Sequence, residues 1–303
     1  MAQPIVLVIG TCDTKLDEIL YLREQIHRTS DCGTIILDAS HTNTSTQRYA
    51  EWAEEVIAPC LDHSKELSSL PRGEYVDKAI DICLGPVKDL VEKGQIHGIV
   101  SAGGSTGSSL ACAIMRKSCP VGMPKLMVST MASGDIKPYI EETDITMMYS
   151  VVDIAGLNTI LKRILQNAAS AIAAMTSSYA RSLTATSPST TGIGRRIGVS
   201  MFGVTTTAVD HIRKILSGQL HQDEGFEIYV FHATGAGGKA MERLIEEGQL
   251  DAVIDLTTTE IADELFGGVL TAGPDRLEAA ARKGIPQIIS VGGTYPLPPP
   301  LLH

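Results

Sequence analysis

Short apolar runs alternate along the first half of the chain with segments in which apolar residues recur every three or four positions. Buried parallel strands form near-continuous apolar runs, which predicts strands at residues 5–11, 34–40, 98–104, 125–131 and 145–151. Helical spacing predicts helices at residues 16–29, 74–94 and 108–117. Gly85-Pro86 predicts a bend in the second of these helices. A further Ala- and Leu-rich helix is expected from Asp153, as its N-cap, to about Tyr179.

The same alternation returns after a stretch of small and polar residues at 182–194, whose composition is typical of a linker. In the second half, apolar runs predict strands at residues 196–203, 228–234, 252–258 and 286–292. Helices are predicted at residues 207–218, 239–248, 260–268 and 275–284. The chain is therefore divided into a first domain at 1–181, a linker at 182–195, a second domain at 196–292 and a Pro-rich, irregular tail at 293–303.

Both halves have the strand–helix order of doubly wound domains. The segments VLVIGTCDTKLDEI and VSMFGVTTTAVDHI both run from a strand through glycine and a Thr-containing turn into an amphipathic helix. The predicted fold class is α/β, with two doubly wound, Rossmann-like domains and mainly parallel sheets. Ligands of such sheets bind at the carboxyl ends of the strands, where the loops rich in Gly, Ser and Thr fall.

Composition narrows the classes of partner. The 303 residues carry a formal net charge of −10, which disfavours direct nucleic-acid binding because phosphates need Lys and Arg. The six cysteines form no CxxC pair and no Cys/His cluster of zinc spacing, so no metal ligand is assigned. The chain begins without a basic leader, and no apolar run reaches the roughly 18 residues of a membrane span. We expect a cytoplasmic protein with reduced thiols that does not bind membranes.

The segment IVSAGGSTGSSLACAIM, residues 99–115, has the densest candidate chemistry. A strand that ends at Gly103 to Gly107 and leads into a helix can turn several backbone N–H groups toward an anion. Ser105 and Thr106 add hydroxyl donors. The segment matches neither the P-loop pattern nor GxGxxG. Taken alone, it is equally consistent with a tight turn capped by Ser and Thr.

Further polar segments end the neighbouring predicted strands. In GTCDTK, residues 10–15, Lys15 suits a phosphate, whereas Asp13 suits a metal-bound water, a ribose hydroxyl or the helix start. The alternative makes Asp13 or Thr14 a plain N-cap. Asp38 ends the second strand, where acidic residues often bind a ribose diol. STMASGD, residues 129–135, is a third polar loop or an ordinary surface turn.

In the second half, FHATGAGGKAMERL at 231–244 is another glycine-rich loop at a helix start. His232, Asp255 and Glu260 lie near predicted strand ends and are the candidate catalytic, acid–base groups. A structural role is favoured over catalysis: Thr258 or Thr259 caps the next helix, Glu260 favours its N-terminus, and His232 is a buried, hydrogen-bonded histidine.

Several segments taken together resemble one family. They are GTCDTKLDE, GIVSAGGSTGSSLA, GMPKLMVSTMASGD, YSVVDIAGLN, ILQNAASAIAAM, GVSMFGVTTTAVD, VFHATGAGGKAMERLI and DLTTTEIADELFGGV. The chain resembles the ATP-binding-domain family typified by the tomato mosaic virus resistance protein. The resemblance implies two Rossmann-like subdomains, ATP and Mg²⁺ at the first subdomain, and a homodimer. In the tomato protein, this domain binds a viral replication protein and inhibits viral replication. For this chain, the resemblance therefore implies a protein partner.

The predicted function is that of an ATP-binding, Mg²⁺-dependent binding or regulatory module. Two alternatives stay open: a phosphotransferase or hydrolase that acts on a small metabolite at the interdomain cleft, and a NAD(P)-dependent oxidoreductase, against which the missing GxGxxG speaks. The sequence leaves open whether the protein is an enzyme. The predicted nucleotide-binding residues are Gly10, Thr11, Asp13, Thr14, Lys15, Asp38, Gly103, Gly104, Ser105, Thr106, Gly107, Ser129, Thr130, Ala132, Ser133 and Gly134.

The chain departs from the family pattern at its end. After ISVG the pattern continues with Ala-Leu-Asp and a polar segment, whereas this chain reads GTYPLPPPLLH. We expect a truncated or alternatively spliced terminus, which leaves open whether the second domain's site and the dimer contact are complete.

Overall fold

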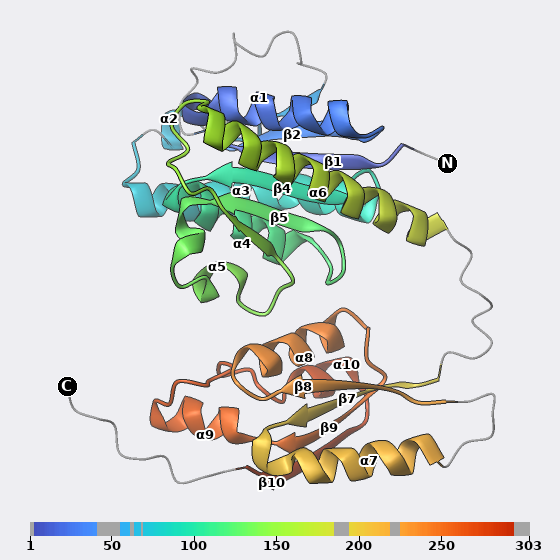
Figure 1. Ribbon diagram of the computed structural model, residues 1–303. Coiled ribbons are helices and arrows are strands. Elements are labelled where there is room, and N and C mark those ends of the chain that lie inside the picture. Colours follow the sequence, from blue (N-terminus) through green and yellow to red (C-terminus); the bar gives the residue numbers. More distant parts are fainter. Residues whose placement is uncertain are drawn as a thin grey trace. The chain divides into compact units, whose positions relative to one another are not determined.

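The computed structural model describes residues 3–40, 55–60, 64–67, 69–184, 194–218 and 225–293 (Figure 1). The chain divides into two compact units, residues 1–185 and 186–303. The expected tail from 294 onward and residues 185–193 of the expected linker lie outside the described residues. Helix α6 (Thr159–Thr184) continues into the range predicted as linker. The Ser182 hydroxyl donates to the Tyr179 carbonyl at 2.7 Å, which keeps this polar end within the helix.

The first unit contains a six-stranded sheet in the order β3-β2-β1-β4-β5-β6, with every pair parallel. The strands are β1 (Ile5–Gly10), β2 (Gly33–Asp38), β3 (Val56–Ile57), β4 (Gly98–Gly103), β5 (Lys125–Ser129) and β6 (Thr146–Tyr149). This is the 3-2-1-4-5-6 order of the Rossmann sheet, and it reverses between β1 and β4. Because β1 pairs directly with β4, the loops that follow these two strands are neighbours.

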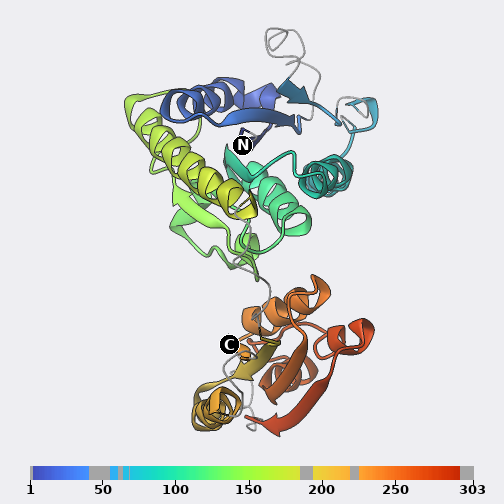
Figure 2. The same cartoon turned by 90° about the vertical axis from the view of Figure 1, so that its right-hand side faces the viewer.

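Helices cover both faces of this sheet (Figures 1 and 2). Helices α1 (Cys12–Thr29) and α6 pack on one face, and α3 (Arg72–Glu92) and α4 (Ser105–Ser118) pack on the other. Alternate residues of β1 supply the two cores, with Val6 and Val8 toward α1 and Leu7 and Ile9 toward α4. The shorter elements are α2 (Ser64–Leu67), the 3₁₀ helix η3 (Thr130–Ser133) and α5 (Lys137–Ile140).

One local prediction for this unit is wrong. Asp153 is not an N-cap, because α6 begins at Thr159 and the Asn158 Oδ1 accepts the Leu161 N–H at 2.9 Å. Helix α3 is continuous from Arg72 to Glu92 with Pro86 inside it, so the bend expected at Gly85-Pro86 does not interrupt the helix. Its apolar face stays packed through this point, since Cys83 and Val87 are fully buried.

The second unit has a four-stranded parallel sheet in the order β10-β9-β7-β8. Its strands are β7 (Arg196–Met201), β8 (Glu227–His232), β9 (Ala252–Thr257) and β10 (Gln287–Gly292). Helices α8 (Ala236–Glu246) and α10 (Ala279–Lys283) pack on one face, and α7 (Thr206–Gly218) packs on the other. The 3₁₀ helix η4 (Gly203–Thr205) precedes α7, and α9 (Thr259–Phe266) follows β9.

The helix predicted at 275–284 is shorter in the structure, where it is confined to α10. Leu277 has a φ of 80°, which a right-handed helix cannot include. The predicted fold class, α/β with two doubly wound and mainly parallel domains, is confirmed. None of the described helices combines the length and the apolar character that crossing a membrane requires.

Candidate functional site

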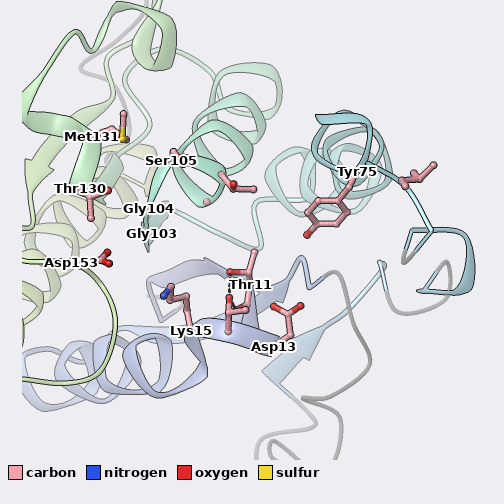
Figure 3. A pocket seen from close by; sticks show the side chains of 14 residues that line it. Thr11, Asp13, Lys15, Tyr75, Gly103, Gly104, Ser105, Thr130, Met131 and Asp153 are labelled. Carbon is pink, nitrogen blue, oxygen red and sulfur yellow. Dashed lines mark hydrogen bonds between the residues drawn. The ribbon is translucent and has the colours of Figure 1, made fainter. Parts of the chain in front are cut away.

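A cavity of about 880 Å³ opens at the carboxyl edge of the first sheet, where the strand order reverses (Figure 3). The loop after β1 and the loop after β4 form its centre. Its lining among the described residues is Thr11, Asp13, Thr14, Lys15, Leu70, Tyr75, Gly103, Gly104, Ser105, Thr106, Gly107, Thr130, Met131 and Asp153. The position agrees with the rule that open α/β sheets bind ligands at the switch point.

The structure brings most of the predicted nucleotide residues to this one cavity, namely those of both central loops and Thr130. The predicted residues that do not line it are Gly10, Asp38, Ser129, Ala132, Ser133 and Gly134. Gly10 has a packing role, since a Cβ there would lie 2.5 Å from the Ile19 side chain. Ser129 is buried, and its hydroxyl accepts the Met131 N–H at 2.9 Å and lies 2.6 Å from the Ser108 hydroxyl.

Asp38 is fully buried and faces the start of α1. Its Oδ1 accepts the Cys12 N–H at 3.1 Å and the Ser40 N–H at 3.0 Å, while the Asp13 N–H donates to the Ser40 hydroxyl at 2.9 Å. A carboxylate at this position compensates the positive end of the helix dipole. Asp38 therefore caps α1, in place of the ribose contact predicted for it and of an N-cap at Asp13 or Thr14.

Cys12 lies beneath the cavity and is 1% exposed. Burial, with the neighbouring Asp38 carboxylate, raises the pKa of this thiol well above its ordinary value. The side chain remains a protonated, packed thiol and supplies no nucleophile.

The start of α4 differs, because its N-cap residue is Gly104, which has no side chain to cap the helix. Among the described residues, no carboxylate and no other group accepts the N–H groups of Ser105 and Gly107. A Cβ at Gly104 would make an ordinary contact, 3.8 Å from the Thr130 hydroxyl oxygen, and a Cβ at Gly107 would meet nothing within 4 Å. The Ser108 hydroxyl donates to the Gly104 carbonyl at 2.8 Å and fixes the loop from below. This loop leaves both donors and space on its cavity side.

Lys15 supplies the positive charge of the cavity wall. Helix α1 is kinked at this residue, with φ −129° and ψ 20°. In the part of the chain that the structure describes, the half-buried Lys15 ammonium has no hydrogen-bond or ion-pair partner. Figure 3 shows its amine turned toward the side of the cavity where Asp153 lies.

The outer walls contain residues that sequence reasoning did not assign to the site. Leu70 and Tyr75 come from the start of α3, and Met131 and Asp153 follow β5 and β6. The Tyr75 hydroxyl donates to the Ala39 carbonyl at 2.6 Å, and burial raises the pKa of this phenol. Asp153 and Met131 stood in segments that carried the family resemblance, YSVVDIAGLN and GMPKLMVSTMASGD, which was the available pointer to them. Leu70 and Tyr75 lie in no segment with a recognised chemical pattern.

The second unit does not assemble the candidate acid–base group. Asp255 and Glu260 are fully buried and both pair with Arg276, whose Nε lies 2.8 Å from the Glu260 Oε2. The other Glu260 oxygen accepts the N–H groups of Gly235 at 2.7 Å and Gly238 at 3.0 Å. The glycine-rich loop of this unit is thus filled from within by a carboxylate.

Two further expectations for this unit are corrected. His232 is exposed, not buried, and its ring stacks on Phe202 at a centroid distance of 5.5 Å. Thr258 does not cap α9 with its side chain, because its hydroxyl donates to the Ser290 carbonyl at 3.1 Å. The sequence pattern also missed Arg276, the buried cation on which Asp255 and Glu260 converge.

The described residues contain no group of three or more His, Cys, Asp or Glu side chains placed to hold a metal ion. Two carboxylates, Asp13 and Asp153, nevertheless line the cavity. Mg²⁺ is commonly bound by one or two carboxylates together with substrate phosphates. The wall therefore fits a cation that arrives with a phosphate ligand.

Solved structures align over nearly the whole chain with low scores. The glycosyltransferase SnogD from Streptomyces nogalater is 13% identical with a TM-score of 0.29, over 97% of this chain and 83% of that protein. A protein from Listeria monocytogenes is 10% identical with a TM-score of 0.34, over 95% of this chain and 79% of that one. Scores this low carry no argument about function.

Sequence comparison is more specific. A UPF0261 protein of Clostridium tetani is 42% identical, over 95% of this chain and 68% of its own length, and UPF0261 protein RA0729 of Rhizobium meliloti is 40% identical, over 95% and 67%. The ToMV resistance protein Tm-1(GCR237) of Solanum lycopersicum is 36% identical, over 95% of this chain and 39% of its own length. The N-terminal and C-terminal domains described as "Uncharacterised protein family (UPF0261)" match residues 4–181 and 195–295. The chain therefore belongs to the UPF0261 family.

Proposed function

We propose that the first unit binds ATP, as its Mg²⁺ complex, in the cavity at the switch point of its sheet. The observation that carries the proposal is the unfilled start of α4, where the N–H groups of Ser105 and Gly107 lack described acceptors. The cavity volume of about 880 Å³ lies within the roughly 300–1,000 Å³ typical of small-molecule sites. The protein acts as a binding or regulatory module.

Two other helix starts that follow parallel strands, those of α1 and α8, support an anionic ligand at α4. Asp38 fills the start of α1, and Glu260 fills the start of α8. In both, a carboxylate of the protein satisfies backbone N–H groups near the positive end of a helix. The start of α4 has donors of the same kind, and within the described ranges no carboxylate accepts the N–H groups of Ser105 and Gly107, so an external anion suits it.

Lys15 makes phosphate a better choice than a carboxylate ligand alone. A half-buried ammonium without a partner in the described part of the chain, lining the same cavity as Ser105 and Gly107, favours a ligand with several negative oxygens. Thr130 and Ser105 add hydroxyl donors on the same wall. Leu70 and Tyr75 offer an apolar side against which a purine base can pack.

A binding role is favoured over acid–base catalysis in the second unit. Asp255 and Glu260 are fully buried and paired with Arg276, so neither reaches a substrate as a free acid or base. The exposed His232 has Phe202 as its described ring neighbour. These contacts are those of a structural network.

The viral role is not extended to this chain. The ToMV susceptible protein tm-1(GCR26) and the ToMV resistance protein Tm-1(GCR237) of tomato are similar to it at 35% and 36% identity. Resemblance at this level does not separate resistance from susceptibility. From the resemblance we therefore extend only nucleotide binding to this chain. A protein partner has to be identified by experiment.

Isothermal titration of the purified chain tests the proposal, with ATP, ADP and NAD each measured with Mg²⁺. We expect ATP to bind and to raise the midpoint of thermal unfolding by mass action. Lys15→Ala is expected to weaken ATP binding by about tenfold or more, since a hydrogen bond to a charged group contributes about 1.5–3 kcal/mol. Lys88→Ala, on α3 outside the cavity, is the matched control.

The two alternatives give different results in the same experiments. Stabilisation by NAD and not by ATP would replace the proposal with the oxidoreductase. Phosphate release from ATP in the presence of a metabolite, lowered by His232→Ala, would favour the phosphotransferase or hydrolase. The homodimer and a protein partner remain predictions from the resemblance, and light scattering with and without ATP tests the first of them.

A further inference from the structure

We propose that Asp153 holds the divalent cation that accompanies the phosphate ligand; this inference rests on the proposed nucleotide function. Asp153 lies on the loop between β6 and α6 and lines the cavity. Figure 3 shows its carboxylate across from the Gly103–Gly104 turn, on the side toward which the Lys15 amine points. Among the described residues, no group hydrogen bonds or pairs with this carboxylate.

The loop that carries Asp153 is fastened on both sides of it. Before it, the Ser150 N–H donates to the Ser129 carbonyl at 3.2 Å, and the Ser150 hydroxyl donates to the Val152 carbonyl at 2.6 Å. After it, Ile154 is fully buried in the core shared by α1 and α6. The Gly156 N–H then donates to the buried Glu18 carboxylate of α1 at 2.7 Å. The backbone that carries the exposed Asp153 carboxylate is therefore anchored beside the cavity.

The backbone beside Asp153 adopts a conformation that its residue type disfavours. Val151 has a φ of 62°, in the left-handed region, and its side chain is 59% exposed. A β-branched residue there is a genuine outlier, and such strain tends to gather at ligand-binding positions. The Val152 N–H donates to the Ser150 carbonyl at 2.6 Å, which closes a γ-turn at Val151, two residues before Asp153.

Charge indicates what Asp153 binds. The described lining carries two carboxylates, Asp13 and Asp153, against one ammonium, Lys15. A polyphosphate placed among these groups meets repulsion from both carboxylates unless a cation lies between them. Mg²⁺ resolves this, because it accepts carboxylate and phosphate oxygens together. Asp153 is the carboxylate without a described partner, so it is the one available as a ligand.

The test is isothermal titration of ATP into the full chain with Mg²⁺ and, separately, with EDTA. For the unaltered protein, Mg²⁺ is expected to tighten ATP binding by tenfold or more. Asp153→Asn should lose this gain while its affinity in EDTA stays equal or improves, since one repulsive charge is removed. Asp153→Glu should recover part of the gain. Asp89→Asn, an exposed carboxylate on α3 outside the cavity, removes the same charge and should change neither value.

A second readout uses Mn²⁺ in place of Mg²⁺. Paramagnetic relaxation of water by protein-bound Mn²⁺–ATP should be present in the unaltered chain and lost in Asp153→Asn. An Asp153→Asn protein that keeps the full Mg²⁺ gain and the Mn²⁺ signal overturns the role of Asp153 and leaves the nucleotide function standing. Failure of the unaltered chain to bind ATP with either metal overturns both. Equal binding in Mg²⁺ and EDTA overturns the cation alone.

Discussion

Two glycine-rich loops of this chain, Gly103–Gly107 and Gly235–Gly238, have the same local structure but differ in what accepts their backbone N–H groups. Each follows a parallel strand and opens a helix, α4 in the first unit and α8 in the second. In the second loop, the N–H groups of Gly235 and Gly238 donate to the buried Glu260. In the first loop, Ser105 and Gly107 have no acceptor among the described residues.

The glycines themselves have different reasons in the two loops. A Cβ at Gly237 would overlap the His232 carbonyl oxygen, and a Cβ at Gly238 would overlap the Glu260 carboxylate. A Cβ at Gly104 or Gly107 meets nothing closer than 3.8 Å. The second loop needs glycine for its own packing at Gly237 and Gly238. The first loop needs it at Gly103, where a Cβ would lie 3.2 Å from the Gly107 Cα, but has room for a side chain at Gly104 and Gly107. Glycine content alone therefore does not identify an anion site. The deciding feature is whether a side chain of the protein already accepts the N–H groups of the loop.

The largest expected effect is on stability and comes from removing the Glu260 carboxylate from the second loop. Glu260→Ala leaves Arg276 with one fewer buried carboxylate and orphans two backbone N–H groups. Breaking a buried ion pair costs about 3–5 kcal/mol, which lowers the unfolding midpoint of a domain of this size by roughly 10 °C or more. Calorimetry of the full chain measures this, and the loss should fall on the transition of the second unit.

Two further variants keep that measurement interpretable. Glu260→Gln retains an acceptor for the Gly235 and Gly238 N–H groups and should restore part of the stability. Glu264→Ala removes an exposed carboxylate from the same helix and should change the midpoint little. If Glu260→Ala unfolds at the same temperature as the unaltered chain, the filled-loop description is wrong.

A smaller effect separates the glycines of the two loops. Gly237→Ala forces a methyl group against the His232 carbonyl and should destabilise the second unit by about 1–3 kcal/mol. Gly104→Ala is the matched change in the open loop, where φ is −78°, and should stay within about 0.5 kcal/mol of the unaltered chain. Denaturant unfolding gives both free energies.

For ATP binding we expect the opposite order, with the larger effect from a substitution in the first loop. Gly104→Val, with its branched side chain in the cavity, is expected to block ATP binding while the fold persists, and Gly237→Ala should leave ATP binding unchanged. Normal ATP binding by a folded Gly104→Val protein would remove the glycine loop from the site.

The sequence predicted the meeting of the two cavity loops because parallel pairing places the carboxyl ends of β1 and β4 side by side. It also predicted the helix after Lys15, whose non-helical angles mark the kink in α1. These features follow from local pattern and from topology. Both are readable without knowledge of any side-chain contact.

The contents of the loops could not be read from the chain in the same way. Asp38 and Glu260 accept hydrogen bonds from N–H groups that lie 26 and 25 residues away along the chain. These contacts form only once the sheets have folded and brought the partners together. Asp153 was predicted as a helix cap because it precedes an Ala-rich helix. In the structure Asn158 has that role, because its Oδ1 accepts the Leu161 N–H. Carboxylates at strand ends are thus ambiguous between capping and binding until their burial is known.

The smallest expected effect identifies which unfolding transition belongs to the unit with the open loop. The Ile5 N–H donates to the His97 Nδ1 at 3.2 Å at the start of β1, so the neutral imidazole is the form that the fold uses. Loss of solvation lowers the pKa of His97 below its ordinary value of 6.5. The unfolded chain then binds the proton more readily than the folded one. Stability from His97 is full above about pH 6.5 and is lost as the pH falls through the lowered pKa.

Acidification from pH 7 to 5 should therefore lower the midpoint of the first unit, and His97→Gln should weaken this dependence because Gln keeps an acceptor that does not titrate. The difference is about 1 kcal/mol at most, the contribution of one hydrogen bond. His27, whose pKa burial and Arg23 also lower, retains part of the dependence in the variant. Calorimetry across this pH range measures both proteins, with Glu260→Ala marking the other transition. An identical pH dependence in His97→Gln would mean that the His97–Ile5 contact does not stabilise the sheet on which the cavity is built.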